Sequence, residues 1–284
     1  MSTNGMGGMG WKRDLPDVRD YTSDATDVAR VLDRSKPLKA AARRLPRTVD
    51  LREWCSPVED QGSLGSCTAN AGIGLLEYFQ RRAFGRHLDG SRLFLYKVTR
   101  ALLGWTGDQG AYLRTTMKGM VLFGVPPEPY WRYDAGKFDE EPPAFCYAFG
   151  QSYKAIRYYR LDPPGTPPGG ILADVRRKLA ARLPSMFGFS VYSSMPAIGE
   201  GKGEIPYPRP GDRLEGGHAV VAIGYDDGKT IGKEKGALRI RNSWGTAWGD
   251  AGYGWLPYAY VENGLAVDFW SLVEAGFVDT ELFR

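Results

Sequence analysis

The strongest periodic segment of the 284-residue chain begins near Ser66. Apolar side chains recur there at spacings of three and four, at Cys67, Ala71, Leu75, Tyr78 and Phe79. This period puts them on one face of a helix, which we therefore expect to be buried along its length. A serine at a helix start can accept hydrogen bonds from the free amides of the first turn, so Ser66 is the predicted N-cap.

Further helices are predicted on both sides of the middle of the chain. One lies within 93–103, where the spacing of the side chains is mixed. Another lies within 111–123, where Met117, Met120 and Val121 recur at helical spacing. Gly124 and the prolines after it end the second of these, because they interrupt helical hydrogen bonding. Beyond a proline–glycine connector at 161–170, another helix is expected from Ile171 onward.

From Ser185 onward the pattern changes to that of strands, in MFGFSVY, GHAVVAIGY, ALRIRN and GYGWL. A helix-rich first part and a strand-rich second part indicate an α+β fold with two lobes. We assign the helical lobe to about 60–150 and the β-rich lobe to about 151–275.

The first 44 residues show no clear period and form an N-terminal extension. Residues 1–10 are rich in glycine and methionine, and we expect them to be mobile. Six basic residues and no acidic one fall between Arg34 and Arg47, which is typical of an exposed segment. The extension is either a solvated arm or a pro-segment, and its composition does not distinguish them.

The net charge of +4 gives no indication of nucleic-acid binding, because basic and acidic residues are mostly interspersed. No run approaches the roughly 18 apolar residues of a membrane-spanning helix. The N-terminal sequence MSTNGMGGMGWKRDLPD lacks the apolar core of a secretory signal. We therefore expect a soluble protein, cytoplasmic or exported without a Sec signal peptide, and we expect it to be a monomer.

Three cysteines are too few for a disulfide framework. Cys67 lies at the start of the buried helix, where the helix dipole and the free amides stabilise a thiolate. The loop before it, QGSLGS, consists mostly of small residues that let the backbone approach a ligand closely. Its first residue, Gln61, could join the Cys67 backbone N–H as a donor to an oxyanion. If Cys67 is catalytic, Cys55 and Cys146 could pair once or stay free.

A thiol nucleophile needs a base, and the chain contains only two histidines, His87 and His218. His87 lies in the polar stretch RRAFGRHLDG, which is typical of a surface histidine. His218 begins a strand that we expect to pair antiparallel with ALRIRN. If Gly224 faces Gly236, His218 lies directly opposite Asn242, whose amide oxygen could orient the imidazole.

Each of these residues also has an ordinary structural interpretation. A lone cysteine on a helix is more often a small buried hydrophobe than a nucleophile. His218 could be a hydrogen-bonded core histidine, and Asn242 could cap the end of a strand.

Three segments resemble the signature regions of the papain family of cysteine peptidases, in the family's order. They are QGSLGSC (61–67), GGHAV (216–220), and RNSWG followed by GDAGYGW (241–255), within a resemblance that covers about 45–275. The resemblance implies a papain-like α+β fold, in which a helical lobe and a barrel-like β-rich lobe enclose the active site in the cleft between them. His218 follows Cys67 by 151 residues and Asn242 follows it by 175, slightly more than the family's usual interval of about 130–150. We therefore expect insertions near 161–170 and 199–214.

The resemblance also implies a mechanism, that of an endopeptidase acting through a thioester. It makes Cys67 the nucleophile, His218 the general base and acid, Asn242 the residue that orients His218, and Gln61 an oxyanion donor. Trp244 would shield the contact between the histidine and the asparagine from water. No metal or cofactor is implied, and the chain has no CxxC or HExxH motif.

The resemblance also implies which residues line the pocket for the substrate's second side chain, and these positions look like Gly110, Gly217 and Ala219. All three are small and uncharged, so we expect a roomy pocket that prefers an apolar side chain. Leu64 and Thr68 differ from the cysteine and the aromatic residue of plant and lysosomal members, and resemble bacterial members without a leader.

LPRTVDLR (45–52) resembles the start of the mature enzymes, so the peptidase domain is expected at 45–284 and the extension stands where a pro-segment would. Trp11–Tyr21 could lie along the cleft and exclude substrate, as in a zymogen, with the basic end of the extension accessible for processing. Two other functions remain open: a thiol acyltransferase, and a non-enzymatic binding module with a blocked cleft.

Overall fold

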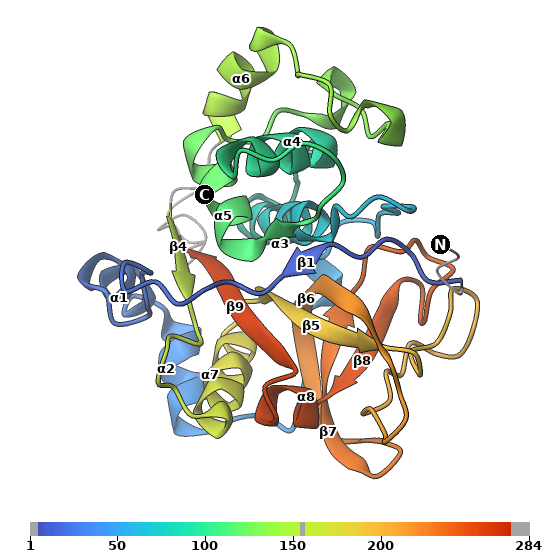
Figure 1. Cartoon of the computed structure of the whole chain (residues 1–284). Coiled ribbons are helices and arrows are strands. Elements are labelled where there is room, and N and C mark those ends of the chain that lie inside the picture. Colours follow the sequence, from blue (N-terminus) through green and yellow to red (C-terminus); the bar gives the residue numbers. More distant parts are fainter. Residues whose placement is uncertain (1–4, 154–156, 274–284) are drawn as a thin grey trace.

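The computed structural model describes residues 5–153 and 157–273. The helices are α1 (Thr26–Leu32), α2 (Lys36–Arg43), α3 (Cys67–Phe84), α4 (Arg92–Leu102), α5 (Leu113–Leu122), α6 (Ala144–Gly150), α7 (Pro168–Ala180) and α8 (Tyr258–Glu262). The strands are β1 (Trp11–Lys12), β2 (Thr48–Asp50), β3 (Ala111–Tyr112), β4 (Arg157–Arg160), β5 (Ser185–Tyr192), β6 (Leu214–Ile231), β7 (Glu234–Arg241), β8 (Tyr253–Pro257) and β9 (Ala266–Val273). Helices α3 to α6 form one layer, and the large sheet forms the other together with α1, α2, α7 and α8, which lie beside or below it (Figure 1). The α+β fold, with a helical part and a β-rich part, is confirmed, while the domain boundaries at 44 and near 150 stay predictions.

The central helix α3 is buried on all sides from Cys67 to Phe79, because α4 and α5 cover one side and the sheet covers the other. It ends at Gly85, whose φ of 69° lies in the left-handed region that favours glycine. Ser66 is the N-cap residue as predicted, but its side chain accepts no hydrogen bond from a backbone N–H of the first turn. The hydroxyl bonds to Tyr133 and Asn70 instead, so the predicted capping interaction is wrong.

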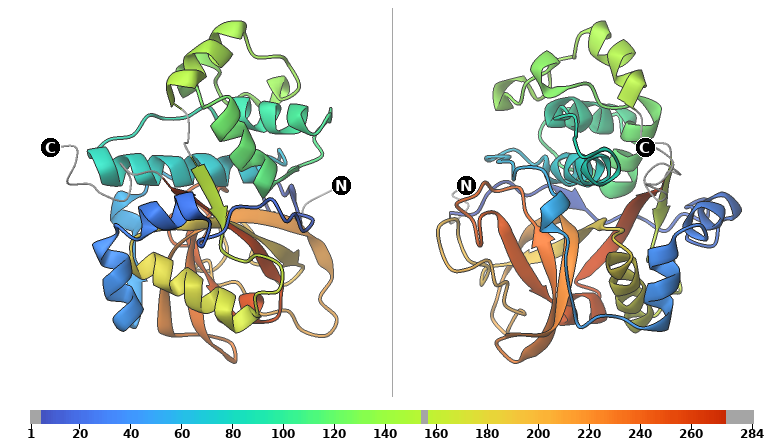
Figure 2. Two further views of the ribbon diagram at one scale, coloured as in Figure 1. Left: turned by 90° about the vertical axis from the view of Figure 1, so that its left-hand side faces the viewer. Right: turned by 180° about the vertical axis from the view of Figure 1, so that it is seen from behind.

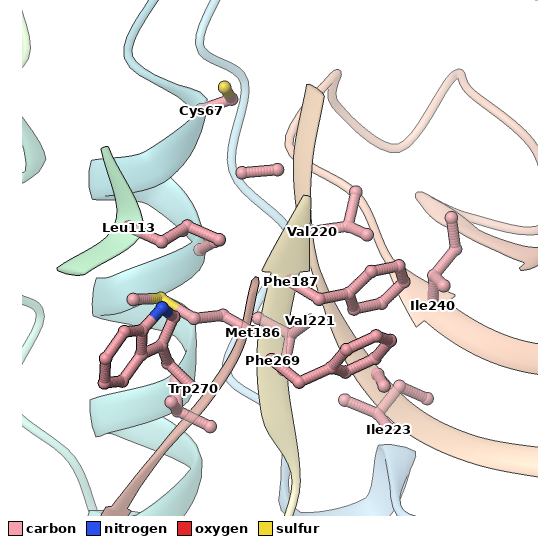
Figure 3. Packing of buried hydrophobic residues seen from close by; sticks show 14 of the residues in the cluster. Cys67, Leu113, Met186, Phe187, Val220, Val221, Ile223, Ile240, Phe269 and Trp270 are labelled. Carbon is pink, nitrogen blue, oxygen red and sulfur yellow. The ribbon is translucent and has the colours of Figure 1, made fainter. Parts of the chain in front are cut away.

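The large sheet has the strand order β4-β9-β5-β6-β7-β8, with β2 added to β6. Its ladders are antiparallel, so successive side chains point to opposite faces. In β5, Met186 points toward α3 and Phe187 points to the other face (Figure 3). There Phe187 stacks on Phe269 of β9, with 4.6 Å between the ring centroids. One sheet therefore contributes both to the interface with the helices and to a second core on its far side.

The ladder between β6 and β7 is shifted from the predicted register, because Gly224 faces Arg239 and not Gly236. Near Val221 the shift amounts to two residues, so His218 and Asn242 are not directly opposite. Side chains alternate along a strand, so a two-residue shift leaves both residues on the same face. The predicted register was therefore wrong, but the prediction that His218 and Asn242 lie on the same face of the sheet was right.

The first part of the N-terminal extension runs between the two layers, and the rest lies beside them. Residues 5–12 cross between the helices and the sheet, and β1 pairs in parallel with β3 (Figure 1). Farther along, α2 lies beside α7 (Figure 2). The expectation that residues 1–10 are mobile is wrong for 5–10, which are hydrogen-bonded in this crossing; residues 1–4 lie outside the described residues.

A cluster of buried charges holds the next part of the extension. The backbone N–H of Asp14 donates to Asp268 over 2.8 Å, and the Arg114 backbone N–H donates to Asp14 over 3.1 Å. Arg114 and Arg160 form ion pairs with Asp20 and Asp268, at 2.6 and 2.7 Å respectively. Burial, together with the Asp268 carboxylate, raises the pKa of Asp14 to about 7. The segment after β1 is thus fixed by several charged contacts.

Within the described ranges, no helix combines the length and apolar character needed to cross a bilayer.

Candidate active site

Cys67 is the first residue of α3 and is completely buried. Figure 3 shows its side chain at the end of that helix, directed away from the helix axis. Burial raises the pKa of the Cys67 thiol to about 11. Nearby backbone amides oppose this effect, first that of Ala219 and then that of Gly10. The positive end of the helix also favours a thiolate here, so solvent exclusion is what keeps the thiol neutral.

His218 in β6 and Asn242 just after β7 form a direct contact. The His218 Nε2 and the Asn242 Oδ1 are 2.7 Å apart. Because the same Oδ1 also accepts from the Ser243 backbone N–H at 2.8 Å, it is the acceptor and Nε2 carries the proton. The Nδ1 atom has no hydrogen-bond partner within the described part of the chain. Burial lowers the pKa of His218 to about 4.

Trp244 covers this pair. Its ring lies 4.5 Å from the His218 ring, centroid to centroid, at an interplanar angle of 31°. The tryptophan is itself almost fully buried, so water does not reach the histidine from this side.

The side chain of Gln61 is held in one orientation. The Ser243 hydroxyl donates to Gln61 Oε1 at 2.6 Å, and the Gln61 backbone N–H donates to the Ser243 carbonyl at 2.9 Å. With Oε1 occupied, Nε2 points the other way and donates to the carbonyl oxygens of Leu64 and Gly8, at 2.8 and 3.0 Å. The donor therefore faces the N-terminal extension.

The extension covers these residues with its backbone. The Gly8 carbonyl oxygen accepts from Gln61 Nε2 and also from Trp244 Nε1, at 3.0 and 3.1 Å. Two residues later, the Gly10 carbonyl accepts from the Ala111 backbone N–H at 2.8 Å. Between these anchors the chain passes over Cys67, which explains the burial of the thiol.

The glycines of the extension allow this close approach. A Cβ atom on Gly8 would lie 2.3 Å from the Leu64 carbonyl oxygen, and one on Gly10 would lie 2.0 Å from that of Gly65. Real side chains do not come so near to backbone, so a larger residue at either position would push the segment away from the loop.

Comparison with known proteins identifies the family of the chain. The profile described as "Papain family cysteine protease" matches residues 45–266. The chain belongs to the papain family of cysteine proteases. It is therefore a hydrolase of a family that acts on peptides or proteins.

Three relatives illustrate the range of similarity within the family. The structure of xylellain, a cysteine protease from Xylella fastidiosa, shares 34% sequence identity and a TM-score of 0.75, and the match covers 94% of this chain and 96% of that one. An uncharacterised peptidase C1-like protein of Acanthamoeba polyphaga mimivirus is 33% identical over 93% of this chain and 86% of its own length. Cathepsin K of Gallus gallus is 29% identical over 74% of this chain and 58% of its own.

The residues predicted to line the papain-family pocket meet the extension. A Cβ atom on Gly217 would lie 2.5 Å from the Trp11 carbonyl oxygen. A Cβ atom on Gly110 would lie 1.9 Å from the Gly10 carbonyl oxygen. Ala219 is buried, with its backbone beside the thiol. Sequence reasoning missed Gly188 of β5, where a Cβ atom would lie 2.0 Å from the Trp11 ring. A glycine inside an apolar strand was the available signal.

A cavity of about 530 Å³ remains open beside the covering segment. It is lined by residues 8–12, 108–109 and 215–217 together with Ser63.

The other predicted residues lie elsewhere. His87 is half-buried beyond the end of α3 and contributes nothing to this site. Cys55 and Cys146 are unpaired, as is Cys67, so the possible disulfide does not form.

Proposed function

We propose that the chain is an endopeptidase that cleaves peptide bonds through a thioester on Cys67, and that residues 8–11 block the cleft until they are displaced. The catalytic assignment rests on the 2.7 Å contact between His218 and Asn242. The residue after His218 in β6, Ala219, has its backbone next to the buried thiol of Cys67.

In the uncovered site, His218 Nδ1 takes the thiol proton and the Cys67 sulfur attacks the substrate carbonyl carbon. Gln61 Nε2 and the Cys67 backbone N–H donate to the oxyanion that forms. The protonated histidine then gives its proton to the departing amine, which leaves a thioester. Water attacks the thioester while His218 accepts a proton, and the acid product leaves as the thiol is restored.

The catalytic proposal is tested by replacing Cys67 and mapping a label. Cys67→Ala should abolish peptidase activity, and a peptide epoxide that alkylates thiols should label Cys67 and no other residue. Cys146→Ala is the matched control, since it also removes a buried free thiol. Activity retained in Cys67→Ala, or a label on another residue, would rule out the assignment. Adding an amine acceptor tests for an acyltransferase, which would form amide faster than free acid.

The blocking proposal rests on what the extension occupies. The Gly8 carbonyl uses the hydrogen-bond donor of Gln61 that the reaction needs, at 3.0 Å. The groups that the extension turns toward the sulfur include the amides of Gly10 and Trp11, and an amide N–H is no electrophile. The segment therefore occupies the site in a form that the thiol does not attack.

A chain that begins at Arg13 tests this proposal. It lacks the covering residues but keeps Asp14 and Asp20, which bind to Arg114 and to Asp268. We expect its kcat/KM to exceed that of the full-length chain, and a free peptide of residues 5–12 to inhibit it. Equal kcat/KM for both chains, with no inhibition by the peptide, would leave the extension as an arm without regulatory effect.

The pocket proposal follows from the position of Trp11. Its indole packs on Gly188 and Gly217, which have no side chains to fill the space. We propose that this space accepts a large apolar side chain two residues from the cleaved bond on the acyl side. Fastest cleavage of library peptides with Arg or Lys at that position would contradict the proposal.

A further inference from the structure

The loop that carries Gln61 is joined to the start of α3 by a side chain from a distant part of the chain. Tyr133 lies between the short helical turns at Glu128–Tyr130 and Ala135–Lys137. Its hydroxyl donates to the Gln61 carbonyl oxygen at 3.0 Å and lies 2.6 Å from the Ser66 hydroxyl. It therefore contacts both ends of the loop that precedes the nucleophile.

The protons of this contact can be ordered in only one way. A carbonyl oxygen is an acceptor only, so the single proton of Tyr133 is used on Gln61. Tyr133 must then accept from Ser66, whose hydroxyl in turn accepts from Asn70 Nδ2 at 3.0 Å. The same Asn70 nitrogen also donates to the Ser66 carbonyl at 3.1 Å. The result is a directed chain of hydrogen bonds from the first turn of α3 to the backbone of Gln61.

The tyrosine ring is itself fixed. The guanidinium of Arg92 lies 4.3 Å from the ring centroid and is held by ion pairs with Glu59 and Glu128, at 3.0 and 3.6 Å. The Tyr133 backbone N–H donates to Glu128 at 2.6 Å. Burial also raises the pKa of Tyr133, so its hydroxyl keeps its proton at neutral pH. This arrangement holds a donor at one position relative to the loop.

We propose that Tyr133 is a positioning residue for the oxyanion hole. The two proposed donors are Gln61 Nε2 and the Cys67 backbone N–H, which belong to opposite ends of the loop. Tyr133 fixes the spacing between these ends, while Ser243 fixes the rotation of the Gln61 amide. The inference rests on the proposed function, because it needs Gln61 and Cys67 to act as described. Donors of this kind work only when they are held within a fraction of an ångström of the oxyanion.

The variant Tyr133→Phe removes the hydroxyl and keeps the ring on Arg92. In the full-length chain we expect kcat to fall about tenfold while KM stays within about twofold, since the lost contact acts in the transition state. The rate of Cys67 alkylation by iodoacetamide should stay within about twofold of wild type, because alkylation needs an accessible thiol and His218 but no oxyanion hole. Unchanged alkylation also shows that the covering segment opens as before.

Two controls separate positioning from general stability. Tyr78→Phe deletes another buried hydroxyl, one that donates to the Arg182 carbonyl at 3.2 Å from within α3, and it should leave kcat within about twofold. Ser66→Ala breaks the same chain one step earlier, so it should lower kcat without changing alkylation. Ser66→Ala also serves as the test if Tyr133→Phe does not fold.

A double-mutant comparison decides the matter. If Tyr133 acts through Gln61, Tyr133→Phe should change kcat by less than about twofold in a Gln61→Ala background. The proposal is overturned if Tyr133→Phe leaves kcat unchanged in the wild-type background, if alkylation falls as far as kcat, or if the effect is fully additive with Gln61→Ala. A failed proposed function looks different, because Cys67→Ala would then stay active or Gln61→Ala would have no effect.

Discussion

Replacing Gly10 by valine should open the cleft without shortening the chain. The Cβ atom would lie 2.0 Å from the Gly65 carbonyl oxygen and 2.6 Å from its carbon, so backbone would meet a branched side chain from the first atom. Overpacking of this kind costs about 1–3 kcal/mol, which shifts the balance toward the uncovered form by about 5- to 150-fold. If the covered form dominates in the wild type, kcat/KM should rise by that factor, up to the limit set by complete opening.

Two measurements on the full-length protein test this prediction: kcat/KM with a fluorogenic peptide, and the rate of Cys67 alkylation by iodoacetamide. Both should rise together, because both need access to the same thiol. Leu15→Ser is the control, since Leu15 belongs to the same extension but is 74% exposed. If folded Gly10→Val matches both wild type and Leu15→Ser in both assays, residues 8–11 do not limit access and the blocking proposal fails.

Other predictions concern the catalytic groups and pH. Gln61→Ala should remove about 2.7–4 kcal/mol of transition-state stabilisation, measured as a fall in kcat of about 10²–10³-fold. Asn242→Ala should lower kcat/KM less, because it removes the 2.7 Å contact that orients His218 and leaves the proton carrier in place. With the pKa of Cys67 near 11 and that of His218 near 4, both groups of the covered site are neutral between these values, so alkylation of the wild type should be slower than that of Gly10→Val throughout the range from about pH 5 to pH 9. Docking raises the pKa of Asp14 from 3.8 to about 7, so the docked state holds one more proton between these two values. The stabilisation is complete below about pH 4, falls steadily above it, and is lost once the pH has passed 7. The kcat/KM of the wild type relative to Gly10→Val should therefore rise between about pH 4 and pH 7 and level off above that, and Asp14→Asn should remove most of that dependence.

The sequence predicted which residues of the proposed catalytic site lie together better than it predicted the geometry around them. The pairing of His218 with Asn242 tolerated an error of two residues, because alternation along β7 keeps Asn242 on the same face. A shift of one residue would have separated them. The irregularities in the β6–β7 ladder, which move the register, have no signal in the local pattern. Strand β9 was missed because its run of buried residues, AVDFWSLV, does not alternate.

Contacts between segments that are distant in the chain could not be predicted from the sequence. Ser66, the serine before Cys67, has the local preference of a helix cap. Its hydroxyl instead forms a hydrogen bond with Tyr133, a residue that is distant in the sequence. The glycines near the N-terminus led us to expect a mobile segment, because glycine loses the most conformational freedom on folding. Their contacts with Leu64 and Trp244 reverse that inference, and these depend on how the whole chain folds.

The covering segment is joined to the peptidase domain by the 33 residues between Trp11 and Leu45. An inhibitor attached to its own target rebinds in a first-order step, at an effective concentration on the order of millimolar even for a loose linker. If residues 8–11 block the cleft as proposed, dilution cannot activate the enzyme, and the fraction of open molecules should not depend on protein concentration. A substrate or peptide in solution competes against that same local concentration. Under the same proposal, a cut between Trp11 and Leu45 would remove the covalent link, so the segment could diffuse away and inhibition would then depend on concentration.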